Sequence, residues 1–344
     1  KLAYINNKYV KNGDIDPSEF FIIEDITPQV EEVSEGIENR VALMLEAIST
    51  KTCPQSDIGK HCYNPYECML LERCREFLPE NSIFDLRGGK TKQFALYQQG
   101  ILCIKDIPDD VLLSRQQLIQ KECILTGETH VEKEEIRQFI DTLVSPLYYL
   151  DFETISPALP IYDGMRPYQT IPFQFSLHIV ESDGAQPIHR EFLAEGIEDP
   201  RPQLLYELRN LLGTEGSIIA YNSGFEEGVL KELVEAFPEY LDWFEGILPR
   251  IVDLLKPFSS FHYYHASQKH TASLKKVLPA VTGRGYEEMG IGAGMDASIA
   301  YEKVTYGEAT EEERSQVRSN LLTYCKQDTE GMIWIVDKLK EISC

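Results

Sequence analysis

Short apolar runs alternate with segments of helical periodicity in the part of the chain that follows Pro146. The first runs predict three strands, with a turn at Ser182-Asp183-Gly184 between the second and the third. Helices and strands then alternate, an order typical of a mixed α/β sheet flanked by helices. The predicted strands are Leu147–Phe152, Pro172–Val180, Ile188–Phe192 and Ser217–Tyr221, with a strand or a helix start at Arg250–Leu255. The predicted helices cover about 200–212, 225–237, 272–281, 296–303 and 311–342.

The first 145 residues have a different pattern. Thr27-Pro28 predicts a helix start, because a capping residue precedes a proline at the first helical position, and the helix should run to about Ile48. Its apolar residues recur at spacings of three and four, namely Val30, Val33, Ile37, Val41, Met44 and Ile48. Residues 1–27 suggest a strand or extended lead around an Asn6-Asn7 turn, and another helix is expected near 131–144. We therefore expect a smaller, mostly helical, cysteine-containing region at 1–145 and an α/β domain at 146–344.

Length and composition narrow the protein class. A chain of 344 residues that is 43% hydrophobic is typical of a globular protein with two or three domains. It holds no run of about 18 uncharged apolar residues, so no transmembrane helix is predicted. The start Lys1-Leu2-Ala3 has neither a Met nor a signal-peptide pattern, from which we expect a fragment of a longer, cytoplasmic protein.

The charge balance is strongly acidic. Lys and Arg number 33 and Asp and Glu number 56, which gives a net charge of −23. This argues against nucleic-acid binding by bulk electrostatics, since phosphate binding normally uses Lys and Arg to displace counterions. It leaves room for a carboxylate-rich site that binds metal ions.

Asp151 and Glu153 stand at the end of the first predicted strand. Residues at i and i+2 of a strand point to the same face, so these carboxylates share one side of the sheet. Like charges held this close are unfavourable unless a cation lies between them, and hard divalent ions prefer oxygen ligands. On its own, however, the pair is more typical of a solvated strand end.

Two further acidic motifs lie later in the chain. In Ala220-Tyr221-Asn222-Ser223-Gly224-Phe225-Glu226, an apolar strand ends in a polar turn and a helix begins with a carboxylate in its first turn, which is ordinary helix-dipole chemistry. In Tyr324-Cys325-Lys326-Gln327-Asp328, Tyr324 and Asp328 share one face of the last helix, as a half-buried aromatic beside a surface Asp would. The order of the three motifs is far more specific than any one of them.

Taken in order, the three motifs resemble the tyrosine-type branch of the DEDD superfamily of 3′–5′ exonucleases, over about residues 146–342. Two supporting segments, Ile251–Leu255 and Ser273–Pro279, also resemble this family. The resemblance implies a ribonuclease H-like fold, with a mixed five-stranded sheet flanked by helices. It also implies 3′–5′ hydrolysis of phosphodiester bonds in single-stranded DNA or RNA.

The resemblance implies a centre that holds two Mg²⁺ or Mn²⁺ ions, which activate water and stabilise the leaving oxygen. Asp151 would bridge both ions, and Glu153 and Asp328 would hold the one on the nucleophile side. Glu226 would act through the other ion or a bound water. Tyr324 would orient the attacking water, because an ordinary tyrosine pKa of about 10 makes it a poor base.

Glu226 differs from the family pattern, which has the shorter Asp at this position. Asp253 is a second candidate for that ligand. We prefer Glu226, because Asn222 and Phe225 precede it as in the family motif.

Candidate substrate-binding residues are Asn222, Phe225, Lys269 and Lys275. The two lysines belong to the most basic stretch after the boundary, and a channel lined by them would bind the phosphate chain of a single strand. Aromatic and basic residues also interleave at Phe258–His270, where they would either stack on nucleotides or form a packed loop.

Four of the eight cysteines cluster within about 22 residues: Cys53, Cys62, Cys68 and Cys74. Such soft ligands suit Zn²⁺ or an iron–sulfur cluster, and free cysteines of a reduced cytosol are the alternative. The stretch resembles the cysteine segment after RecB-like nuclease cores, which implies a [4Fe–4S] cluster on Cys62, Cys68 and Cys74 with an upstream fourth ligand. Cys53 would then be a bystander or a replacement ligand.

The whole chain resembles a bacterial family of unknown function that joins a RecB-like nuclease, a cysteine cluster and a DEDD domain. The resemblance implies an upstream nuclease domain of the same protein as a partner. Two other functions stay open: an inactive fold that binds nucleic acid or a protein, and a metal-cluster scaffold. Two divalent ions would offset about four carboxylates, so the remaining acidity predicts a narrow, local substrate groove and weak binding to bulk duplex.

Overall fold

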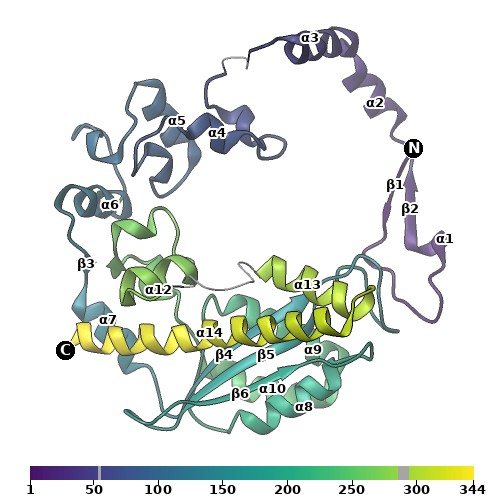
Figure 1. Ribbon diagram of the computed structural model, residues 1–344, viewed down its shortest axis with the longest axis vertical. Coiled ribbons are helices and arrows are strands. Elements are labelled where there is room, and N and C mark those ends of the chain that lie inside the picture. The colour runs from purple at the N-terminus through teal and green to yellow at the C-terminus, as the bar shows by residue number, and fades with distance from the viewer. Residues whose placement is uncertain (53–55, 286–293) are drawn as a thin grey trace.

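The computed structural model describes residues 1–52, 56–285 and 294–344 (Figure 1). A five-stranded mixed sheet has the order β6-β5-β4-β7-β8. Strand β5 runs antiparallel to both β4 and β6, whereas β4, β7 and β8 are parallel. The strands are β4 Leu147–Ile155, β5 Ile171–Val180, β6 Ile188–Leu193, β7 Ser217–Ala220 and β8 Ile251–Asp253. The predicted mixed α/β sheet is therefore confirmed, and the open choice at Arg250–Leu255 is resolved as a strand.

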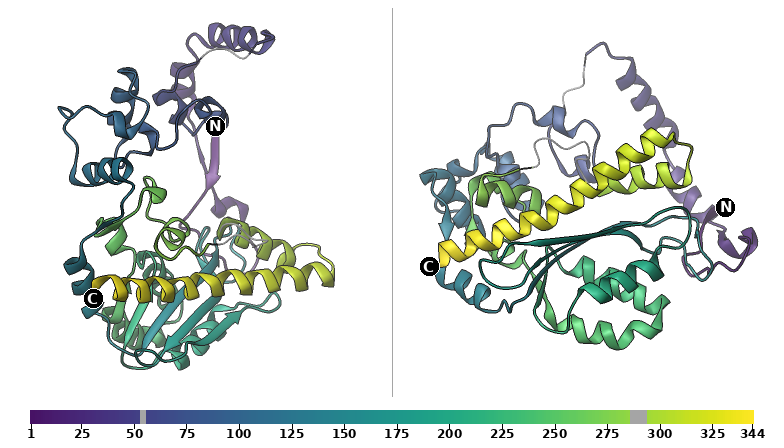
Figure 2. Two further views of the ribbon diagram at one scale, coloured as in Figure 1. Left: turned by 60° about the vertical axis from the view of Figure 1, so that its left-hand side comes forward. Right: turned by 60° about the horizontal axis from the view of Figure 1, so that its bottom comes forward.

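Strand β4 is apolar along most of its length because it is central in the sheet and covered on both faces. Tyr148, Leu150 and Phe152 pack in the core beneath α8 Arg201–Leu211, α9 Gly224–Ala236 and α10 Leu241–Ile247. Leu147 and Tyr149 point to the other face, covered by α7 Lys133–Asp141, α12 Leu274–Thr282 and α14 Glu311–Ser343. Figures 1 and 2 show α14 crossing this face of the sheet. The alternation of side chains along β4 thus decides which residues meet α14.

Helix α14 begins at a capping box: Thr310 Oγ1 accepts from the Glu313 amide at 3.2 Å, and the Glu313 carboxylate accepts from the Thr310 amide at 2.8 Å. Its apolar stripe includes Leu321, Met332 and Leu339, all at most 1% exposed. Fully burying one such side chain stabilises the fold by about 2 kcal/mol. The burial of this stripe fixes the rotation of α14, and with it the position of Asp328 over β4.

The predicted helix from Thr27 to Ile48 is wrong in its continuity. It is two helices, α2 Thr27–Ser34 and α3 Ile37–Ser49, because Gly36 adopts a left-handed conformation with φ of 71°. Its apolar positions are also exposed, from 46% at Val30 to 79% at Ile48. The periodicity correctly indicated helix, and the apolar side chains of both helices face solvent.

The first residues form a two-stranded sheet of β1 Leu2–Ile5 and β2 Phe21–Glu24, with α1 Pro17–Phe20 before the second strand. The predicted Asn6-Asn7 turn does not close this pair. After Asn6 the chain instead reaches the segment that connects β4 to β5, where the Lys11 amide donates to the Met165 carbonyl at 2.9 Å.

The other helices are α4 Leu71–Arg75, α5 Lys90–Gln98, α6 Arg115–Thr126, α11 Lys256–Ser259 and α13 Gly294–Tyr306. Short 3-10 turns are η1 Lys60–Tyr63, η2 Ile83–Asp85, η3 Ile104–Asp106, η4 Pro238–Tyr240, η5 Leu248–Arg250 and η6 Ala266–Gln268. Strand β3 His130–Val131 pairs with β9 Tyr263–Tyr264 and so joins segments on either side of residue 145. The division into 1–145 and 146–344 stays a prediction. Among the described helices, even the 33-residue α14 is not apolar enough to cross a bilayer.

Candidate metal centre

Three carboxylates come together where β4 passes beneath α14. Single carboxylate oxygens of Asp151, Glu153 and Asp328 all lie within 4.8 Å of one another. Glu153 and Asp328 are each 7% exposed. Within the described ranges, no other group of three or more Asp, Glu, His or Cys side chains has ligand atoms this close together.

Local geometry explains the meeting. Asp151 and Glu153 have the same parity as Leu147 and Tyr149, so they continue the face of β4 that α14 covers. The register of β4 against β5 shifts between Glu153 and Thr154, an irregularity of the kind that re-aims side chains next to functional sites. Asp328 comes from the opposite side, on α14. The predicted convergence of the first and third motifs is thus present in the fold.

Burial and the proximity of like charges disfavour the ionised forms of these carboxyl groups. Burial raises the pKa of Asp151 well above its ordinary value, and Asp328, Glu153 and Glu226 raise it further. Burial, and then Asp328, raises the pKa of Glu153 to about 8, although Lys275 opposes this shift. A hard divalent cation between these oxygens would relieve both the repulsion and the cost of burial.

Glu226 lies beside this group and not within it. Its side chain is in the first turn of α9 and is 3% exposed. Burial raises its pKa to about 8 against an opposing backbone hydrogen bond, with Asp253 and Glu227 adding to the rise. Its Oε2 is buried without a hydrogen-bond partner, an arrangement that ordinarily costs about 1–3 kcal/mol. This oxygen is available to a ligand that the chain itself does not supply.

Tyr324 and Lys275 border the carboxylates. Tyr324 is 4% exposed, and burial followed by the charges of Asp328, Glu153 and Asp151 raises the pKa of its phenol far above the ordinary value. The phenol therefore keeps its proton and cannot act as a base, and its role in orienting a water stays a prediction. Lys275 Nζ lies 5.2 Å from the centre of the Tyr324 ring, which places a positive charge at the edge of the site.

Asp253, one of the two candidate ligands of the second motif, has a structural role in the turn between β7 and α9. Asp253 Oδ1 accepts hydrogen bonds from the amides of Asn222 and Leu255, each at 2.9 Å. Asn222 is left-handed, with φ of 68°, which Asn tolerates better than most residues. Asp253 is thus engaged in holding this turn, which favours Glu226 over Asp253 as the acidic residue of the second motif. Phe225 is 46% exposed, and its role in substrate binding stays a prediction.

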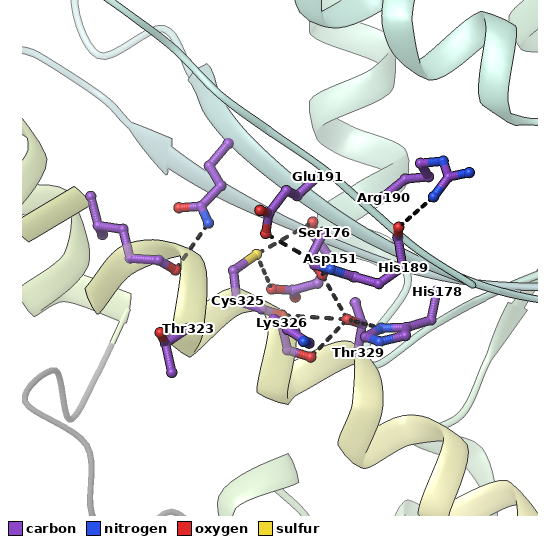
Figure 3. A network of polar contacts seen from close by, with 12 residues as sticks. Asp151, Ser176, His178, His189, Arg190, Glu191, Thr323, Cys325, Lys326 and Thr329 are labelled. Carbon is purple, nitrogen blue, oxygen red and sulfur yellow. Dashed lines mark hydrogen bonds and ion pairs between the residues drawn. The ribbon is translucent and has the colours of Figure 1, made fainter. Parts of the chain in front are cut away.

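Cys325 is a site residue that the sequence motifs did not single out. Its Sγ lies 3.4 Å from Asp151 Oδ2, within range of a thiol hydrogen bond (Figure 3). Burial, followed by the charges of Asp151, Glu153 and Asp328, raises the pKa of the Cys325 thiol, so it stays protonated and donates. Its place between Tyr324 and Asp328 was visible in the sequence, but its contact with β4 was not.

Replacing Cys325 with Ala is expected to weaken divalent-ion binding about tenfold, because outer hydrogen bonds to metal ligands typically contribute 10–100-fold. Cys325→Ser keeps a donor and should lose less. Isothermal titration calorimetry with Mn²⁺ measures both affinities, and thermal melting in EDTA reports any packing defect separately. Equal Mn²⁺ affinity in Ala, Ser and wild-type proteins would contradict a positioning role for the thiol.

A buried polar network holds α14 against β5 next to Asp328. The Thr329 hydroxyl lies 2.7 Å from Ser176 Oγ and 2.8 Å from His178 Nδ1, and Ser176 Oγ lies 3.0 Å from His189 Nε2 (Figure 3). Burial lowers the pKa of both histidines to about 4, so both are neutral near pH 7. Because Ser176 pairs with Asp151 in the β4–β5 ladder, this network fixes the helix opposite that carboxylate.

The aromatic segment Phe258–His270 forms a packed loop. Phe261, Tyr263 and Tyr264 are at most 5% exposed, so the alternative in which they stack on nucleotides is wrong. Phe261 and Tyr264 stack on each other with centroids 4.6 Å apart. The side chain of Lys269 lies against the N-terminal part of the chain, with its Nζ 3.7 Å from Asp85 Oδ2.

The cysteine cluster is not assembled as a three-ligand site in the part of the chain that the structure describes. Cys62 is buried in the local apolar core, Cys74 packs against that core, and Cys68 is exposed. Cys53 lies outside the described residues. A metal or iron–sulfur cluster on these cysteines stays a prediction.

Comparison with known proteins gives relatives but no activity. Residues 148–273 match a family described as a domain of unknown function (DUF2779). The chain is 25% identical over 224 residues to uncharacterized protein UU173 of Ureaplasma parvum, covering 58% of this chain and 32% of that protein. It is 27% identical over 213 residues to the MG366 homolog of Mycoplasma pneumoniae, also uncharacterized, covering 54% and 31%. The chain thus spans about a third of the length of these relatives, and no solved structure gives a significant match.

Proposed function

We propose that the protein is a metal-dependent 3′–5′ exonuclease acting on single-stranded DNA or RNA. The observation that carries this proposal is the buried group of Asp151, Glu153 and Asp328, with Tyr324 one helical turn before Asp328. The mixed five-stranded sheet with helices on both faces supports the ribonuclease H-like fold that the motif resemblance implies.

The side chains fit divalent metal ions. All the converging ligand atoms are carboxylate oxygens, which suit Mg²⁺ and Mn²⁺, and Glu226 adds a buried oxygen without a partner. Asp151, Glu153 and Asp328 would hold the ions, with Glu226 as an outer ligand. Bound there, the ions would supply activation of water and stabilisation of the leaving oxygen.

The chain's own residues would bind and orient the substrate. The Tyr324 phenol keeps its proton and would donate a hydrogen bond to the attacking water or a phosphate oxygen. Lys275, beside Tyr324, would attract the phosphate about to be cleaved. Phe225, half exposed at the start of α9, would stack against the terminal base.

Digestion of 5′-end-labelled DNA and RNA strands with Mn²⁺ tests the proposed activity. We expect labelled products that shorten by one nucleotide at a time from the 3′ end, in Mn²⁺ and not in EDTA. Internal cuts, or a label released first as a mononucleotide, would contradict the 3′–5′ direction.

Glu226→Gln is expected to slow turnover about 10- to 100-fold, as loss of an outer metal ligand typically does. The substitution keeps the shape but removes the charge that acts on Asp151. Glu226→Asp restores the residue that the exonuclease family has at this position and should retain more activity than Gln. Single-turnover rates on a labelled strand measure both variants, and a Gln variant as fast as wild type would remove Glu226 from the site.

The position of Glu226 also favours a second candidate, an inactive fold that binds nucleic acid or a protein. Its carboxylate does not join the three oxygens within 4.8 Å. Such a protein would bind single strands without shortening them and need not bind two metal ions.

A further inference from the structure

A cavity of about 460 Å³ lies between residues 63–93 and the segment that leads into α12, away from the three carboxylates. Three of the residues that line it are cationic: Arg75, Arg87 and Lys90. Tyr63 and His270 also border it, and Glu67 is the acidic residue among those that line it. Basic residues therefore outnumber acidic residues in this lining, whereas acidic residues outnumber basic ones in the chain as a whole.

None of these three cations forms a salt bridge within the described ranges, although the charge of Arg75 helps to lower the pKa of nearby Asp85. The ion pairs within 4.0 Å that the described ranges contain do not include Arg75, Arg87 or Lys90. Arg87 Nη1 instead donates to the His270 carbonyl at 2.7 Å, and Lys90 Nζ lies 3.2 Å from the centre of the Tyr63 ring. In a chain with 56 acidic and 33 basic residues, three cations without a salt bridge, set against Glu67, give this cavity a lining of net positive charge.

We propose that this cavity binds backbone phosphates of a single-stranded nucleic acid. A guanidinium presents paired donors to phosphate oxygens, and a lysine adds a mobile point charge. The N-terminus of α5, which begins at Lys90, adds partial positive charge on the same wall. A net charge of −23 disfavours binding of nucleic acid by bulk electrostatics, so a strand needs such a local site.

The cavity lies within reach of the candidate metal centre. His270 borders the cavity, and Lys275, five residues later, lies beside Glu153 and Tyr324. Five residues span at most about 18 Å even when fully extended. A short strand with its 3′ end at the carboxylates would therefore place upstream phosphates in the cavity. This assignment of the substrate path rests on the proposed exonuclease function.

Strand binding without metal ions tests the cavity by itself. The anisotropy of a fluorescein-labelled single-stranded oligonucleotide is measured with the whole chain in EDTA, at several salt concentrations. Lys90→Gln should weaken binding and reduce the slope of log affinity against log salt by about 0.7, the value for one phosphate contact to a single strand. Lys338→Gln is the matched control, because it removes one exposed lysine charge from α14, where Lys338 pairs with Glu341 at 2.8 Å.

The outcomes separate this inference from the proposed activity. Equal effects of Lys90→Gln and Lys338→Gln, or no strand binding by wild type in EDTA, would overturn the phosphate site. Arg87→Gln provides a second variant and should reduce the slope in the same way as Lys90→Gln. Binding that depends on Lys90 in a protein that never shortens a strand with Mn²⁺ would refute the exonuclease and leave the phosphate site intact.

Discussion

Replacing Asp151 with Asn should reduce Mn²⁺-dependent release of nucleotides by at least about a thousandfold. Asp151 is the carboxylate whose charge interacts with Asp328, Glu153 and Glu226 together, so it is central to the site. Metal ions contribute several kcal/mol of transition-state stabilisation, and each 1.4 kcal/mol corresponds to a factor of about ten in rate. Single-turnover digestion of a labelled strand, with wild type in parallel, measures the loss.

The same substitution should not unfold the protein. Asn has nearly the shape of Asp and cannot ionise at a position where burial and like charges disfavour ionisation, so the melting temperature in EDTA should stay the same or rise. Asp109→Asn is a suitable control, because it removes an exposed carboxylate that pairs with Lys121 at 2.7 Å far along the chain from the site. Wild-type turnover by Asp151→Asn would refute the assignment of the site, whatever the stability of the variant.

Without divalent ions, the folded protein should become less stable as the pH rises from about 5 to 8. The pKa values of Glu153 and Glu226 are about 8 in the fold, against an ordinary value of 4.5. Between these values the folded state holds more protons than the unfolded state, so the free energy of unfolding falls with rising pH. The loss is about 1.4 kcal/mol per pH unit for each such group, as an upper limit.

Thermal melting in EDTA and in saturating Mn²⁺, across this pH range, measures the effect. Mn²⁺ should raise the melting temperature most at the high end, because it binds the ionised carboxylates of the folded state. Glu153→Gln should flatten the pH dependence in EDTA. A melting temperature in EDTA that is constant or rises over this range would contradict the charge balance of the site.

The sheet and the first and third motifs could be predicted because local pattern determines them. The apolar run of β4 indicates a covered strand, and its period of two places Asp151 and Glu153 on one face. The spacing of four between Tyr324 and Asp328 places both side chains on one face of α14. Their convergence follows once α14 packs on β4, which the apolar stripe of the helix requires.

Other features depend on contacts between distant segments and could not be predicted. The thiol of Cys325 reaches Asp151 across 174 residues, and Thr329 meets Ser176 across 153. Periodicity indicates an amphipathic helix but not whether another element packs against it. The exposure of Val30 and Ile48 could therefore not be predicted. The aromatics of Phe258–His270 could suit a stacking surface or a core, and only the packing of Tyr264 beneath α6 decides between them.

Calorimetric titration of the metal-free protein with Mn²⁺ tests the central claim, that the buried carboxylates are a divalent metal centre. We predict saturable binding of two ions per chain by wild type, with binding lost or strongly weakened in Asp151→Asn. A folded wild-type protein that shows no saturable Mn²⁺ binding would contradict the account.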